Sequence, residues 1–162
     1  MSVIRIKSIS DLHAILGFSK PRYPLISLID VAQLETKDEQ LGVQFIWDFY
    51  MISLKDSSCG IQYGRNSFDF DEGVMVFSGP GQVYKQVKAF QKGEVQGWML
   101  FFHPDLIRNT HLGQEMEDFS FFNYDVVEAL HLSEEEEATV DSTVRNIQKE
   151  YEQRVDGHSQ RV

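Results

Sequence analysis

Cysteine is almost absent from this chain, which has one such residue, Cys59, among 162. A single thiol cannot form an internal disulfide, so the disulfide-built scaffolds of small secreted proteins are excluded. Because a free cysteine packs as a small hydrophobic residue, we expect Cys59 to be a strand residue rather than a nucleophile. Residues 1–10 also lack the apolar core of a signal peptide, and no stretch approaches the ~18 apolar residues that can cross a membrane. We therefore expect a cytoplasmic protein without a membrane partner.

Positive charge is also scarce. The chain has 15 lysines and arginines against 25 aspartates and glutamates, which gives a net charge of −10 at pH 7. Duplex DNA carries about one negative charge per 1.7 Å, so a protein needs clustered lysines and arginines to bind it. The sequence has no such cluster, and we expect that it does not bind nucleic acid by itself.

The motifs of metal and nucleophilic catalysis are missing as well. The five histidines are His13, His103, His111, His131 and His158. They form neither an H-x-H pair nor an H-E-x-x-H motif, so we predict no metal site and no cofactor. No G-x-S-x-G or phosphate-loop motif occurs, and the acidic residues Asp69, Asp71 and Glu72 lie in a predicted hairpin turn, where such groups usually face solvent. We therefore predict that the chain is not an enzyme.

Aromatic and apolar residues, by contrast, are plentiful. The chain has 12 phenylalanines, and 42% of its residues are hydrophobic. Between Leu25 and His103, short apolar runs alternate with turn sequences such as 55–58, 71–73 and 78–82, at roughly the 8–12-residue spacing that is typical of a β-sandwich or barrel. The sequence therefore predicts one mainly β domain in this region.

The strongest strand signal covers residues 43–54. Its odd-numbered positions include Phe45, Trp47, Phe49 and Met51. Its even-numbered positions include Ile46, Tyr50, Ile52 and Leu54. Because both faces of the strand are apolar, both should be covered. We expect one face to line the interior of a barrel and the other to contact a helix or a partner.

Two segments outside this region have helical patterns. Residues 9–20 predict a short helix with Ser10 as N-cap and Gly17 as its stop. The clearest helix follows Ser133, which forms an S-x-x-E capping box with Glu136. Its apolar stripe is Val140, Val144, Ile147, Tyr151 and Val155. We expect this stripe either to face the core or to form a dimer interface.

Five blocks in order carry a resemblance to a known family. They are SDLHAILGFSKPRYPLISLID, WDFYMISLK, YGRNSFDFDEGVMVFSGPGQV, GWMLFFHPDLI and FFNYDVVEALHLSEEEE. Over residues 9–160 this pattern resembles the N-terminal domain of AraC-family transcription regulators. The resemblance implies a cupin-like jelly-roll β-barrel over residues 25–103. An N-terminal segment with a short helix, residues 1–24, would precede the barrel, and a helical segment, residues 104–162, would follow it.

The resemblance also implies a function in effector sensing, dimerisation or both. Family members bind DNA through a C-terminal domain with two helix-turn-helix motifs, and this sequence does not contain that pair. They commonly dimerise through the helices after the barrel, so we expect a homodimer. The dimerisation candidates are Val140, Val144, Ile147 and Tyr151.

The aromatic strands would suit a small ligand, a sugar or another metabolite, inside the barrel. The pocket candidates are Trp47, Tyr50, Tyr63, Trp98, Phe101 and His103. A fully packed core agrees equally well with these residues. Two alternatives stay open: a metal-free cupin isomerase or lyase that uses His103 with Asp48 or Gln62 on a sugar, and a module that binds a sugar or only dimerises.

Overall fold

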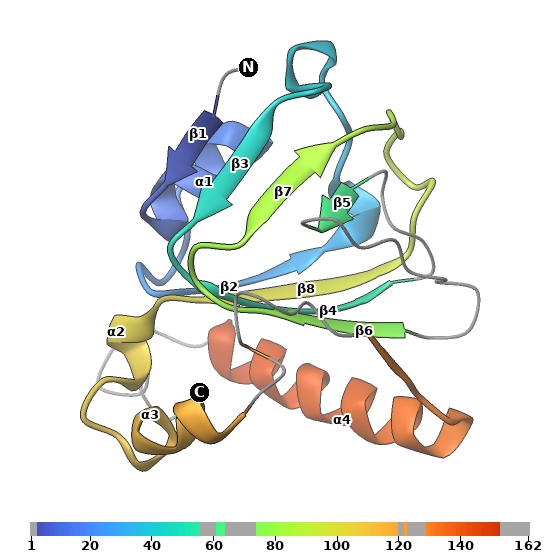
Figure 1. Ribbon diagram of the computed structural model, residues 1–162. Coiled ribbons are helices and arrows are strands. Elements are labelled where there is room, and N and C mark those ends of the chain that lie inside the picture. The colour runs from blue at the N-terminus through green and yellow to red at the C-terminus, as the bar shows by residue number, and fades with distance from the viewer. Residues whose placement is uncertain (1–2, 56–60, 64–73, 120–121, 123–128, 153–162) are drawn as a thin grey trace.

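Two β-sheets lie face to face above a layer of helices in the computed structural model, which describes residues 3–55, 61–63, 74–119, 122 and 129–152 (Figure 1). Sheet A has the strand order β1-β3-β7-β5: β1 (Val3–Ile6), β3 (Gln44–Trp47), β7 (Val83–Gln86) and β5 (Ile61–Tyr63). Sheet B has the order β2-β8-β4-β6-β9: β2 (Ile26–Asp30), β8 (Gly97–Phe102), β4 (Tyr50–Lys55), β6 (Val74–Ser78) and β9 (Ala129–His131). The prediction of a mainly β fold with a C-terminal helix is confirmed.

The expected closed barrel is not what the described strands form. Backbone ladders join strands within sheet A and within sheet B, and in the described part of the chain none joins the two sheets. The described strands therefore form a sandwich of two separate sheets. Cys59, the acidic residues of the predicted turn (Asp69, Asp71 and Glu72) and the stripe residue Val155 lie outside the described residues.

The predicted strand 43–54 is divided between the two sheets. β3 ends at Trp47 in sheet A, and β4 begins at Tyr50 in sheet B. Asp48 fixes the corner between them: its backbone N–H donates to the Ile6 carbonyl at 3.0 Å, and its carboxylate accepts two hydrogen bonds from Arg5, at 2.8 and 3.1 Å. The same carboxylate raises the pKa of the Arg5 guanidinium above its usual value. A strand that switches sheets at a bend is one way to form the corner of a sandwich.

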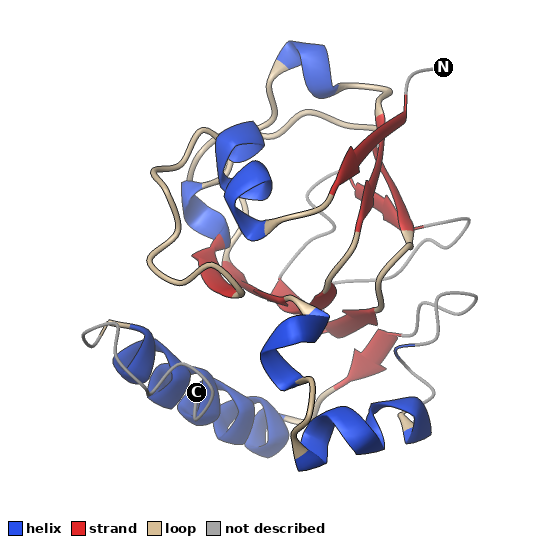
Figure 2. Cartoon of the chain, turned by 90° about the vertical axis from the view of Figure 1, so that its left-hand side faces the viewer, coloured by secondary structure: helices blue, strands red, loops and turns tan. Residues whose placement is uncertain are grey.

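The two predicted faces of residues 43–54 nevertheless point to opposite sides on both strands of this corner. The odd-numbered Trp47, Phe49 and Met51 belong to the inner core between the sheets. The even-numbered Tyr50 and Ile52 pack against the outer core, between sheet B and the helices. Figure 2 shows these helices on the far side of sheet B from sheet A. One face therefore lines the interior, and the other contacts helices, as expected.

The first helix, α1 (Ile9–Leu16), ends as predicted at Gly17, whose φ of 77° lies in the left-handed region that favours glycine. The predicted N-cap, Ser10, is wrong. Ser8 has the extended backbone of a cap, and its hydroxyl accepts a hydrogen bond from the Asp11 N–H at 3.1 Å. Two short 3₁₀ turns, η1 (Val31–Gln33) and η2 (Asp38–Gln40), follow β2.

Four helical elements lie under sheet B: α2 (Pro104–Ile107), α3 (His111–Glu115), the 3₁₀ turn η3 (Met116–Asp118) and α4 (Glu134–Tyr151). The predicted capping box of α4 is confirmed, because Ser133 Oγ accepts from the Glu136 N–H at 3.2 Å and Glu136 Oε2 accepts from the Ser133 N–H at 2.8 Å. None of the helices in the described ranges has both the length and the apolar character needed to cross a membrane.

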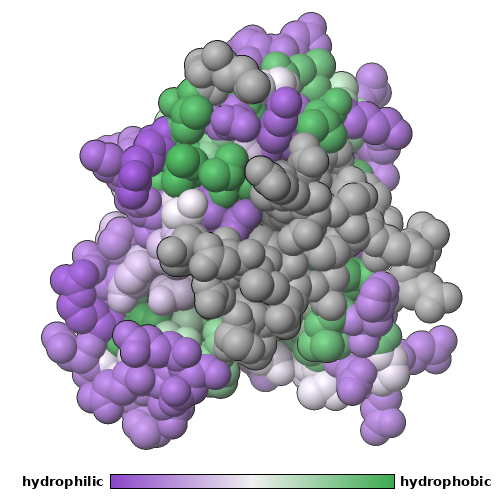
Figure 3. Space-filling view, in the orientation of Figure 1, coloured by the Kyte–Doolittle hydropathy of each residue, from purple (hydrophilic) through white to green (hydrophobic). Residues whose placement is uncertain are grey.

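Apolar residues also reach the surface around sheet A. Val3 and Ile4 of the edge strand β1 are exposed, and so are Leu41 before β3 and Val87 after β7. Figure 3 shows several apolar patches, in green, in the upper part of the molecule, with hydrophilic residues in purple between them. Leu130 of β9 in sheet B and Leu112 of α3 are exposed as well.

Candidate ligand site between the last helix and the sheet

Three hollows adjoin sheet B. A cavity of about 80 Å³ lies on its inner side, between the sheets and α1. An apolar groove of about 510 Å³ lies on its outer side, between the sheet and α2, α3 and α4. A cleft of about 570 Å³ lies between the sheet and the C-terminal half of α4. The space for a ligand is therefore mostly on the outer side.

The inner cavity is small because aromatic rings fill the interior. The ring of Trp47 stacks on Tyr84 with a centroid distance of 3.6 Å, and Phe101 packs edge-on against Trp47 at 5.6 Å. For comparison, an apolar cavity of about 150 Å³ can hold a benzene molecule. The inner cavity lined by described residues, at about 80 Å³, is too small for a sugar. Trp47 and Phe101, two of the six predicted pocket residues, are thus core residues.

Some polar atoms in the interior have no partner. Among the described residues, Trp47 Nε1, Ser53 Oγ and Gln82 Oε1 are buried without a hydrogen bond. Ser78 and Tyr84, by contrast, join their hydroxyls in a hydrogen bond. Each unsatisfied buried group costs about 1–3 kcal/mol, so the inner core is not optimised for stability at these positions.

A serine and a histidine also form a close pair inside the fold. Ser27 Oγ lies 2.6 Å from His13 Nε2, and His13 Nδ1 lies 2.9 Å from the Ser19 carbonyl oxygen. In the neutral imidazole, an Nδ1–H that donates to this carbonyl leaves Nε2 to accept from the Ser27 hydroxyl. The arrangement is that of a nucleophile and its base, but both residues are buried and neither lines any of the three hollows. The pair therefore ties α1 to β2.

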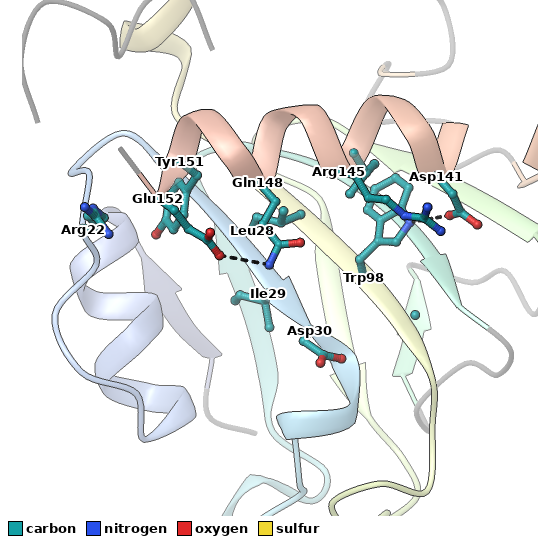
Figure 4. A pocket seen from close by; sticks show the side chains of 12 residues that line it. Arg22, Leu28, Ile29, Asp30, Trp98, Asp141, Arg145, Gln148, Tyr151 and Glu152 are labelled. Carbon is teal, nitrogen blue, oxygen red and sulfur yellow. Dashed lines mark hydrogen bonds between the residues drawn. The ribbon is translucent and has the colours of Figure 1, made fainter. Parts of the chain in front are cut away.

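The cleft is formed by elements far apart in the sequence (Figure 4). One wall is sheet B, with Leu28 and Asp30 from β2 and Trp98 from β8, and Arg22 lies at one end. The other wall is α4, whose side chains here are Asp141, Val144, Arg145, Gln148, Tyr151 and the adjoining Glu152. A molecule in the cleft would contact both the sheet and the helix.

Hydrogen bonds and ring contacts hold the two walls together at both ends. Trp98 Nε1 donates to Asp141 Oδ1 at 3.4 Å. At the other end, the Tyr23 hydroxyl donates to the Glu150 carbonyl at 3.3 Å, and the Tyr23 and Tyr151 rings lie 5.2 Å apart. The C-terminal half of α4 is thus held to the rest of the fold at Asp141 and again at Glu150 and Tyr151, with the cleft between these points.

The apolar groove lies beside the cleft on the same side of the sheet. Tyr50 stacks on Phe102 at 5.1 Å and meets Phe122 edge-on at 5.2 Å. Burial, with a smaller effect from the negative charge of Glu117, raises the pKa of Tyr50 above its usual value. Among the described lining residues only Thr110 is polar, so the groove offers a ligand little beyond apolar contact.

The remaining pocket candidates are dispersed. Tyr50 belongs to the outer core and Trp98 lines the cleft. His103 caps α2, where its Nδ1 accepts from the Asp105 N–H at 3.1 Å. Tyr63 lies on β5 in sheet A, and its side chain is outside the described part. The six candidates therefore do not form one pocket.

The stripe of α4 faces sheet B. Val144 is buried, Ile147 lines the apolar groove and Tyr151 lines the cleft, while Val140 is half-buried. This is the core-facing alternative of the two that the sequence left open. The prediction missed the polar residues of the cleft, Arg22, Asp30, Asp141, Arg145 and Gln148, because no sequence signal joins the first two to the three helix positions more than 100 residues later.

No family model, curated protein or solved structure matches the chain. In the part that the structure describes, no group of three or more histidine, cysteine, aspartate or glutamate side chains is placed to hold a metal ion. The function must therefore be argued from the cleft itself.

Proposed function

We propose that this chain is a non-catalytic regulatory domain that senses a small molecule in the cleft between α4 and sheet B. The observation that supports it best is the position of the cleft, which has the sheet as one wall and the last described helix as the other. A ligand that contacts both walls favours the docked state of α4 over any state in which the helix has moved. The size of the response is set by the difference in affinity for the two states.

The AraC-type arrangement fits this proposal. In AraC-type regulators, helices follow the regulatory domain, and through these helices it acts on a separate DNA-binding domain. The net charge of −10 supports such a division, because contact with phosphates requires clustered positive charge. The two-sheet sandwich would then be an open variant of a cupin-like jelly roll.

A homodimer belongs to the same proposal. Its interface would not be the α4 stripe, because Val144, Ile147 and Tyr151 are engaged with sheet B. We propose instead the exposed apolar residues of β1 at the edge of sheet A, Val3 and Ile4. Sedimentation of the chain tests this: we expect a dimer that the substitution Val3→Glu converts to a monomer, and a monomeric chain would contradict it.

Hydrogen–deuterium exchange with a panel of metabolites tests the sensing function. A ligand present at about 100 times its Kd stabilises the folded state by about 2.7 kcal/mol, so hits are first found by thermal shift. For each hit we expect slower hydrogen exchange in α4. We expect the substitution Trp98→Ala to abolish both the thermal shift and the slower exchange. A hit that acts equally on wild type and Trp98→Ala, or a panel of sugars, amino acids, nucleotides and organic acids without any hit, would contradict the proposal.

The enzyme alternative has less support. His103 is used as the cap of α2, and the Asp48 carboxylate is held by Arg5. The side chain of Gln62 lies outside the described part. These three groups were the polar residues that a cupin-type reaction in the interior would need, and the inner cavity of about 80 Å³ does not admit a sugar.

A further inference from the structure

The cleft contains charges of both signs that do not neutralise each other. Asp141 and Arg145 are one turn apart on α4, a spacing at which side chains of opposite charge can meet. Arg145 nevertheless forms no ion pair or hydrogen bond with a described residue, and neither does Arg22 at the other end. Asp141 accepts only the long bond of 3.4 Å from Trp98. Both an anionic and a cationic group of a ligand would find a partner here.

The acidic residues at the rim argue against a ligand that is only anionic. Asp30 and Glu152 line the cleft together with Asp141, so three carboxylates accompany two guanidinium groups. Asp30 Oδ1 accepts from the Ala32 N–H at 3.0 Å, and Glu152 Oε1 accepts from Gln148 Nε2 at 3.3 Å. A simple anion would be attracted by the arginines and repelled by these carboxylates. A ligand with both charges would be attracted by both kinds of group.

The floor between the charges is apolar. Leu28 and Val144 lie there, with the rings of Trp98 and Tyr151. The cleft volume of about 570 Å³ exceeds several-fold the roughly 150 Å³ of a cavity that holds benzene. A side chain of aliphatic or aromatic type can therefore lie on this floor beside the two charged groups.

We propose that the cleft binds a free α-amino acid with an apolar or aromatic side chain. The Arg145 guanidinium would bind its carboxylate, the Asp141 carboxylate would bind its ammonium group, and Trp98 and Tyr151 would contact its side chain. The planar guanidinium fork matches a carboxylate with two parallel hydrogen bonds. A ligand competes easily with any direct Asp141–Arg145 contact, because exposed ion pairs of this spacing contribute little. The inference rests on the proposed sensing function and adds the class of ligand.

Tryptophan fluorescence gives a direct readout of binding. The chain has two tryptophans, and Trp98 lies in the cleft whereas Trp47 is buried between the sheets. We expect L-phenylalanine and L-leucine to change the emission of the wild type but not of Trp98→Phe. N-acetyl-L-phenylalanine lacks the positive charge and L-phenylalaninamide lacks the negative one, so we expect each to bind about tenfold more weakly or worse.

Substitutions in the cleft assign each charge to its partner. Asp141→Asn keeps an acceptor for Trp98, and we expect it to weaken L-phenylalanine about tenfold without affecting the N-acetyl derivative. Arg145→Gln should weaken L-phenylalanine similarly without affecting the amide. Lys149→Gln is the matched control, because Lys149 is an exposed residue of α4 outside the cleft lining, and it should bind as the wild type does.

The outcomes separate this inference from the function on which it rests. Derivatives that bind as well as the free amino acid, or Asp141→Asn and Arg145→Gln variants with unchanged affinity, overturn the amino-acid assignment. A ligand of another charge class that changes the Trp98 emission overturns that assignment too, but leaves the sensing function in place. A chain whose Trp98 emission and α4 exchange respond to no compound overturns both.

Discussion

The two faces of sheet B are covered in different ways, and Phe101 and Phe102 of β8 show the difference at neighbouring positions. Phe101 points into the inner core, where it meets the rings of Trp47 and Phe49. Phe102 points outward, where it stacks on Tyr50 and lines the apolar groove. Among the described residues, the hollow on the inner side measures about 80 Å³, and the two on the outer side measure about 510 and 570 Å³. A second sheet fills its side closely, whereas separate helices leave gaps in which a ligand can bind.

The largest effect that tests this comparison is the loss of one phenyl ring from each face. We expect Phe101→Ala to destabilise the fold by about 3–5 kcal/mol, because rigid aromatic neighbours cannot collapse into the space. Phe102→Ala should cost less, about 3 kcal/mol at the lower end of that range, because the helices can shift toward the sheet. Both side chains are nearly buried, at 2% and 8% exposure, so the difference reports packing rather than burial. Urea unfolding measures both, and equal costs would break the comparison.

The sequence predicted which side chains of residues 43–54 face inward and which face outward better than it predicted where the strands begin and end. The alternation of residues 43–54 was correct because it depends only on local periodicity. Its division at Asp48 was not foreseen, since it depends on Arg5, which is 43 positions away. The strands β1 and β9 were missed because segments of four and three residues carry almost no periodic signal.

The cleft was beyond sequence reasoning for the same reason. Its walls join Arg22, Trp98 and Arg145, and none of these belongs to a local motif. The capping box at Ser133 was predictable, because all its atoms lie within one turn of helix. Local chemistry is thus readable from the chain, whereas a site made between elements appears only with the fold.

A smaller effect concerns α4 alone, the helix that covers the outer face. Ser133→Ala removes the cap hydroxyl, and we expect a loss of about 1 kcal/mol. Hydrogen exchange should become faster in α4 while β4 and β8 keep their protection, since the inner core does not depend on the helix. Ser142→Ala, an exposed position on α4, is the control and should change neither. A uniform rise in exchange over sheet B would mean that the two faces are coupled.

The smallest effect should come from Ser53 on the inner face, and Ser27, a second buried serine with a different partner, provides the contrast. Ser53 Oγ has no hydrogen bond within the described structure, whereas Ser27 Oγ bonds His13 Nε2 at 2.6 Å. Removing an unsatisfied hydroxyl is nearly neutral or stabilising, so we expect Ser53→Ala to change the free energy of unfolding by less than about 0.5 kcal/mol or to raise it. Ser27→Ala leaves the histidine nitrogen unpaired and should cost about 1–3 kcal/mol. Thermal or urea unfolding measures both variants. If Ser53→Ala were the more costly of the two, a buried water or ligand would have to bond the Ser53 hydroxyl. The inner face would then also bind a molecule, a role that we assign to the outer face.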